Sequence, residues 1–139
     1  ALSYNENLNS FNYVKDETLK LLSIPIPDGL DKIMNYHTKL QTLYNQLMKF
    51  YTQNQSEETF IILKNLSVRI SEVAPREEAE RILLKGNKVI EIVNKEQKYD
   101  YIYIEEAVLI NQRLHILSFT ASSDLRRRIN IYNKSIEEL

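Results

Sequence analysis

Apolar residues recur at steps of three and four along most of the chain, which is the spacing of one face of an α-helix. In residues 5–22 the positions at this spacing are Leu8, Phe11, Val14, Thr18, Leu21 and Leu22. Pro25 and Pro27 follow and cannot continue a helix, and Asp28 is a candidate N-cap for the next one. The pattern therefore predicts a first helix over 5–22 and a loop before residue 30.

The strongest periodic pattern lies in residues 30–53. Steps of three and four connect Leu30, Ile33, His37, Leu40, Tyr44, Leu47 and Tyr51. Tyr36, Leu43 and Phe50 widen this face on one side. A face of this width is typical of a helix that contacts two or more neighbours, so we expect helix 30–53 to be central in a bundle.

Two further helices are predicted on either side of Pro75. An apolar face covers residues 57–73, and Ser56 offers the N-cap of that helix. Proline is favoured in the first turn of a helix, and acidic side chains stabilise that end. Pro75 therefore predicts the start of a new helix, with its acidic residues Glu77, Glu78 and Glu80.

The segment 81–104 has two interpretations. The helical pattern passes through Gly86 in phase, and a small residue there would let another helix approach closely. Alternatively, Gly86 and Asn87 form the turn of a β-hairpin, and the alternation in 99–104 forms another strand. We favour the helix.

The last segment, 101–139, keeps steps of three or four to its end. Unbroken, this helix would be about 55 Å long, which is more than its partners can cover. The capping residues around Ser122 indicate either a break there or a final third that projects from the bundle. The projecting part would present a surplus apolar face of Leu125, Ile129, Tyr132 and Ile136.

Together these elements predict an all-α fold, an antiparallel helical bundle of four to five helices with a long C-terminal helix. The length of 139 residues suits one domain, so 1–139 is predicted to be a single helical domain. Because the chain starts at Ala1 and ends on a charged helical pattern, we expect it to be excised from a longer protein.

Composition adds limits on location and partners. The net charge of −1 gives no overall attraction to nucleic acid or to an anionic membrane. The chain has no cysteine, which excludes disulfides and thiolate sites and agrees with an intracellular location, cytoplasmic or nuclear. Its apolar runs are far shorter than the roughly 20 residues that cross a bilayer, so no transmembrane segment is expected.

The sequence holds few residues for catalysis. His37 and His115 are the only histidines, and neither has the spacing of a helical metal site. Neighbouring acidic residues point about 100° apart on a helix, so they do not form facing pairs. A histidine phosphotransfer domain is excluded, because the small residue and the glycine that expose its histidine are missing after His37. We therefore predict no enzyme, no catalytic or metal site, no cofactor and no small-molecule substrate.

Two charged or aromatic clusters suggest surfaces. Three consecutive arginines, Arg126, Arg127 and Arg128, fan across about 200° of a helix, so at least two should be solvated. They form either a solvated face or a site for an acidic partner or nucleic acid. The tyrosines at 99, 101 and 103 suit either boundary packing or an interface.

The stretch from Leu83 to Glu91 is loosely similar to the third helix of GAT trafficking domains. The preceding helix is about two turns shorter than that family's pattern requires, and the family lacks the long last helix, so nothing is transferred from it.

These observations predict a non-catalytic protein-protein interaction domain, a scaffold or adaptor that binds another helical protein or self-associates. Its contacts are expected at Leu125, Ile129, Tyr132 and Ile136. The alternative is a helical domain that binds nucleic acid or an acidic partner through Arg126, Arg127 and Arg128.

Overall fold

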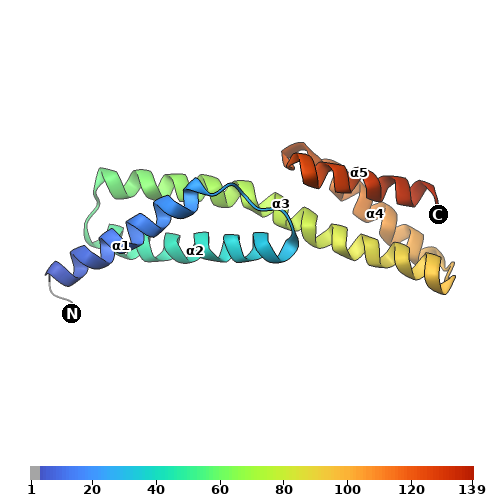
Figure 1. Ribbon diagram of the computed structural model, residues 1–139, viewed down its shortest axis with the longest axis horizontal. Helices are drawn as coiled ribbons and strands as arrows, with labels where there is room; N and C mark the ends of the chain where they lie inside the picture. Colours follow the sequence, from blue (N-terminus) through green and yellow to red (C-terminus); the bar gives the residue numbers. More distant parts are fainter. Residues whose placement is uncertain (1–3) are drawn as a thin grey trace. The chain divides into compact units, whose positions relative to one another are not determined.

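Helices make up almost all of the structure (Figure 1). The computed structural model describes residues 4–139, with side chains from residue 8 onward. Its elements are α1 (Tyr4–Ser23), α2 (Leu30–Gln53), α3 (Glu57–Glu96), α4 (Tyr101–Leu117), the 3₁₀ helix η1 (Ser118–Thr120) and α5 (Ser123–Glu137). Residues 4–139 contain no strand, which confirms the predicted all-α class.

The predicted helices 5–22 and 30–53 are confirmed as α1 and α2. In the loop between them Gly29 has a φ of 98°, a conformation in which other residues are strained. The guanidinium of Arg69 donates hydrogen bonds to the carbonyls of Leu22 at 3.2 Å and Ile24 at 3.0 Å. A cation at this position stabilises the C-terminal end of α1.

The predicted break at Pro75 is wrong, because α3 continues through this residue. A proline in a helix interior removes one backbone hydrogen bond and costs about 3 kcal/mol or more. Val73 before the proline and Ala79 after it are both 0% exposed. Packing on either side therefore holds the helical conformation against the cost of the proline.

The β-hairpin alternative for 81–104 is also wrong. α3 continues to Glu96, and α4 begins at Tyr101 after a connector of four residues. Gln97, in that connector, has a left-handed φ of 52°. The unbroken helical phase through Gly86 was therefore the correct guide.

The segment 101–139 is broken near Ser122, which confirms one of the two alternatives predicted for it. α4 ends in η1, and Ser122 then caps α5 by accepting a hydrogen bond from the Leu125 amide at 3.1 Å. The longest helix is α3 with 40 residues, whereas α4 has 17 and α5 has 15. No final third of a single long helix projects from the fold.

The chain divides into two compact units. Unit 1 consists of the chain up to Pro27 together with 31–74, and unit 2 consists of Asp28–Leu30 and Pro75–Leu139. The boundary on α3 falls between Ala74 and Pro75. Whether the two units form the predicted single domain stays a prediction, since two cores can unfold in one step or in two.

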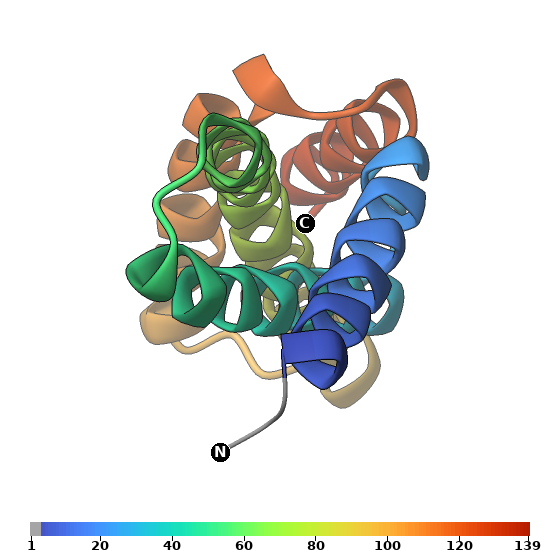
Figure 2. The same ribbon diagram turned by 90° about the vertical axis from the view of Figure 1, so that its left-hand side faces the viewer.

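The core of unit 1 is formed by α1, α2 and the first part of α3. The chain reverses direction from each helix to the next, and Figure 2, a view nearly along α3, shows α1 and α2 beside it. The broad face of α2 is buried as predicted, but α2 contributes only to this core, whereas α3 contributes to both. The buried residues are Val14, Leu21, Ile33, Tyr36, Leu40, Leu47, Ile62, Leu63, Leu66 and Val73.

The core of unit 2 is formed by the second part of α3 with α4 and α5, again in alternating directions (Figure 1). At its centre the ring of Tyr132 lies against Gly86, so that a Cβ at residue 86 would come within 2.6 Å of the ring. The Tyr132 hydroxyl donates a hydrogen bond to the Ala107 carbonyl at 2.7 Å. This confirms that the small residue at 86 permits a close approach between helices. The buried residues are Ala79, Leu83, Ile90, Ile110, Leu114, Leu117, Ala121, Leu125, Ile129 and Tyr132.

Candidate interaction surface

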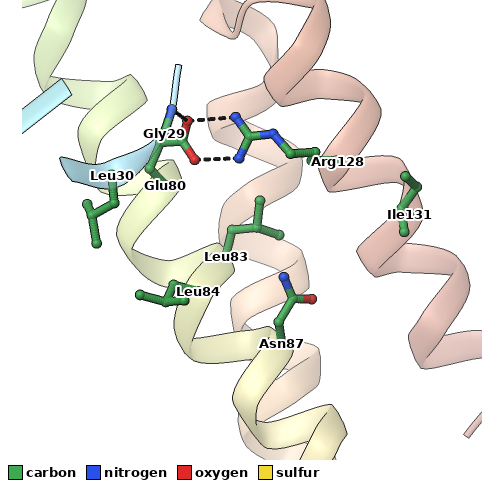
Figure 3. A pocket seen from close by; sticks show the side chains of 8 residues that line it. All are labelled: Gly29, Leu30, Glu80, Leu83, Leu84, Asn87, Arg128 and Ile131. Atoms are coloured by element: carbon green, nitrogen blue, oxygen red, sulfur yellow. Dashed lines mark hydrogen bonds and ion pairs between the residues drawn. The ribbon is translucent and has the colours of Figure 1, made fainter. Parts of the chain in front are cut away.

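An ion pair between a buried carboxylate and a partly buried guanidinium joins α3 to α5 within unit 2 (Figure 3). The two terminal guanidinium nitrogens of Arg128, Nη1 and Nη2, donate to the two carboxylate oxygens of Glu80 at 2.5 and 2.7 Å. The Gly29 amide donates to the same carboxylate at 2.6 Å. Because only 4% of Glu80 is exposed, its charge depends on these donors rather than on water.

Further polar groups surround this pair. The Nε of Arg128 donates to Asp124 at 2.9 Å, and the Ser122 hydroxyl donates to Asp28 at 2.6 Å. The hydrogen bonds that Arg128 donates to Glu80 and Asp124 raise the pKa of its guanidinium above the usual value. In the described part of the chain, no buried side-chain nitrogen or oxygen atom lacks a hydrogen-bond partner. The buried polar groups of the network are thus satisfied by groups of the chain itself.

The ion pair borders a shallow hollow of about 290 Å³. Its lining residues are Gly29, Leu30, Glu80, Leu83, Leu84, Asn87, Arg128 and Ile131. Since the charged groups at its edge already bind each other, the hollow offers a partner mainly apolar contact, through Leu84 and Ile131.

The ion pair predicts a dependence of stability on acid pH. Burial raises the pKa of Glu80, but the hydrogen bonds from Arg128 and the Gly29 amide outweigh burial, so the pKa lies below its ordinary value of 4.5. A carboxyl group whose pKa is lower in the folded chain stabilises the fold above its unfolded pKa, and this contribution disappears as the pH falls through the folded value. Unit 2 should therefore lose stability below about pH 4.5.

Urea unfolding at a series of pH values measures this dependence. Glu80→Gln should flatten the acid side of the profile without removing it, because Glu78 and Asp124 also have lowered pKa values, owing to hydrogen bonds from Arg113 and from Arg127. If the free energy of unfolding of Glu80→Gln falls as steeply with decreasing pH as that of the wild type, the acid dependence does not come from Glu80.

Most of the apolar contacts predicted on α5 are not available to a partner. Leu125, Ile129 and Tyr132 are at most 5% exposed and belong to the core of unit 2, while Ile136 is partly buried against it. The premise of a surplus face on a projecting helix is wrong, because the break at residues 118–122 turns α5 back onto α4. Burial also raises the pKa of Tyr132 to about 12.

The three arginines have different environments. Arg126 and Arg127 are exposed and Arg128 is partly buried, in agreement with the expectation that at least two are solvated. Arg126 donates to the Ser118 carbonyl at 3.3 Å and to the Ala121 carbonyl at 3.4 Å, and Arg127 pairs with Asp124 at 2.9 Å. Binding of nucleic acid or an acidic partner through this triplet stays a prediction. Arg128 is already paired with Glu80.

The largest run of exposed apolar side chains lies on α4 and η1, on the side opposite the core. Tyr101 is 77% exposed, Leu109 and Ile116 are each 57% exposed, and Phe119 is 75% exposed. α4 is therefore apolar on its outer side as well as on its inner side. We call this surface the α4 outer face; it consists of Tyr101, Ile102, Ile104, Val108, Leu109, Ile116 and Phe119.

Charged side chains at the border of this face are turned toward α3. Glu106 pairs with Lys85 at 3.0 Å. Arg113 binds Glu78 through two hydrogen bonds of 2.5 and 2.8 Å. These pairs leave Glu105, Gln112 and His115 as the polar positions among the apolar residues of the face.

Sequence reasoning missed this face, although a signal for it exists. Ile102, Leu109 and Ile116 recur at intervals of seven, which is two helical turns, on the side away from the inner face. The unbroken series of steps of three and four along 101–117 passes through the inner residues. The tyrosine cluster gave a partial indication, since Tyr101 belongs to the outer face.

Residues 4–139 show neither a candidate metal site nor a membrane-spanning helix. In that range no three His, Asp or Glu side chains gather closely enough to hold a metal ion. None of the helices described is long and apolar enough to cross a bilayer.

No protein-family model, no curated protein and no solved structure matches the chain. The functional proposal therefore depends on the surfaces described above.

Proposed function

We propose that this chain is a non-catalytic protein-interaction domain, a scaffold or adaptor that acts by helix packing within a larger assembly. The α4 outer face carries this proposal. On this face the apolar side chains outnumber the polar ones, and a large exposed apolar patch marks an interaction site. The face offers aromatic and branched aliphatic side chains, which contribute strongly at the centres of interfaces.

The state of the ionisable groups supports a non-catalytic role. Hydrogen bonds with Arg113 lower the pKa of Glu78, and Arg128 and the Gly29 amide hold the Glu80 carboxylate in its charged form. A general acid or base must exchange a proton with a substrate, whereas these carboxylates are saturated by donors of the chain itself. An intracellular location, inferred from the lack of cysteine, belongs to the same proposal.

Binding of nucleic acid or an acidic partner by the arginine triplet receives less support. Arg128 is bound to Glu80 and Asp124, and Arg126 to carbonyl groups at the end of α4 and η1. Arg127 and Lys134 line a shallow hollow on α5, but the chain's net charge of −1 gives no added attraction to phosphate.

Leu109→Glu should leave the stability of the chain within about 0.5 kcal/mol of the wild type, because an exposed side chain loses little packing on substitution. It should at the same time reduce binding of a hydrophobic dye. Thermal unfolding and dye fluorescence measure the two effects. The matched control is Ile110→Glu, at the neighbouring inward position, which is 8% exposed and should unfold unit 2.

A photocrosslinking amino acid at position 109, introduced in cells that produce the chain, tests the proposed function directly. We expect protein adducts from this position and none from the same group at Gln41, which is exposed on α2. If position 109 yields no protein adduct while the fold is intact, the proposed function is wrong.

A further inference from the structure

We propose that the α4 outer face binds a second copy of this chain, with the two α4 helices antiparallel about a two-fold axis level with residue 110. This inference rests on the proposed function and names the partner. A two-fold interface uses the same patch on both copies, so the patch must complement itself when the helix direction is reversed.

Five of the seven apolar residues of the face meet this condition. In such a pair, two positions equally far from residue 110 on opposite sides lie at the same height along the helix axes. Tyr101 therefore lies at the height of Phe119 of the second copy, so that one aromatic ring is beside another. Ile104 and Ile116 are likewise equally far from residue 110. Leu109 is next to the axis and therefore meets its own counterpart. These residues thus match when the helix direction is reversed, whereas Ile102 is level with Ser118 and Val108 with Gln112.

Two of the three polar residues of the face are complementary under the same symmetry, while Gln112 is level with Val108 of the second copy. Glu105 and His115 are both five residues from the axis, one on each side, so each carboxylate lies level with the imidazole of the other copy. An imidazole N–H can donate to a carboxylate whether or not the ring is charged. The pair occurs twice in the dimer, and it compensates the charge of Glu105 in the middle of a largely apolar face.

The surroundings of the face favour this partner. Lys85 and Glu78 on α3 already neutralise Glu106 and Arg113 at its border, so no fixed charge is left there to attract a strongly charged partner. The dipoles of two antiparallel helices also place unlike ends together. A second α4 therefore supplies apolar side chains, an aromatic ring and a carboxylate acceptor at the heights along the helix where the first α4 presents their counterparts.

The size of the face sets the strength of the dimer. Residues 101–119 span about 27 Å at 1.5 Å per residue, one helix wide. A single helix pair of this length buries less than the roughly 1,600 Å² of a standard interface. We therefore expect a weak dimer that dissociates on dilution.

Sedimentation velocity on the full chain over a range of concentrations measures the dimer. Glu105→His and His115→Glu should each weaken association about tenfold or more, because each places two like groups level with one another at both sites. The double variant carrying both substitutions exchanges the two roles and should restore association. If the double variant is no better than the single ones, the antiparallel pairing is wrong.

Cysteine crosslinking gives an independent measure, and the chain has no native cysteine to interfere. Leu109→Cys should crosslink to itself, whereas Tyr101→Cys should not, because its counterpart lies about 27 Å away along the helix pair. A mixture of Tyr101→Cys and Phe119→Cys should crosslink as a heterodimer. Self-crosslinking of Tyr101→Cys would indicate parallel helices and overturn the proposal.

The two proposals fail in different ways. If the chain is monomeric at every concentration and the photoadducts at position 109 contain only other proteins, self-association is wrong and the proposed function stands. If position 109 gives no adducts at all and the chain is monomeric, both are wrong.

Discussion

Arg128→Met should lower the free energy of unfolding of unit 2 by about 3 kcal/mol, as removal of one partner from a buried ion pair does. The substitution leaves the Glu80 carboxylate, of which 4% is exposed, with the Gly29 amide as its remaining described donor. Chemical denaturation followed by circular dichroism measures the loss.

Two further variants test the cause of this loss. Arg127→Met removes a neighbouring guanidinium that pairs only at the surface, and it should cost at most about 0.5 kcal/mol. Glu80→Gln combined with Arg128→Met removes both charges but keeps an acceptor for the Gly29 amide, so it should recover much of the stability. If Arg128→Met and Arg127→Met are equally stable, the ion pair has no structural role.

Gly86→Ala should destabilise unit 2 by about 2 kcal/mol through overpacking. Helix propensity alone predicts the opposite sign, because alanine is about 1 kcal/mol better than glycine within a helix. The new Cβ would lie 2.6 Å from the Tyr132 ring, which is 1% exposed and is held by its hydrogen bond to Ala107. The ring therefore cannot move aside without loss of packing.

Thermal and denaturant unfolding of three variants separate these two effects. Asn87→Ala, at the neighbouring exposed position, should slightly stabilise α3 through helix propensity. Gly86→Ala combined with Tyr132→Leu should be less destabilised than the sum of the two single substitutions, because the smaller side chain makes room for the Cβ. Stabilisation by Gly86→Ala alone would contradict the close contact.

The sequence predicts the helices themselves well, because helical periodicity and the prolines near residue 25 are local signals. Pro75 shows the limit of this reasoning. Its local preference is for a helix start, but burial of Val73 and Ala79 on either side keeps α3 continuous. The residue marks a boundary between two cores instead of a boundary between two helices.

The interaction surface was harder to predict, because periodicity identifies an apolar face but not the neighbour that covers it. The face with Leu125 and Ile129 has the expected spacing, yet α3 and α4 cover it once the chain turns at residues 118–122. The ion pair between Glu80 and Arg128 joins residues 48 positions apart, and no local pattern indicates it. The α4 outer face is detectable in the sequence, but only as apolar residues that recur at intervals of seven.

The short connectors between successive antiparallel helices have a kinetic consequence. Three residues join α2 to α3, and four join α3 to α4. Helices that pack on their neighbours in sequence have low contact order, and little loop-closure entropy must be overcome before the core forms. The chain should therefore fold in microseconds to milliseconds, the range of small helical bundles.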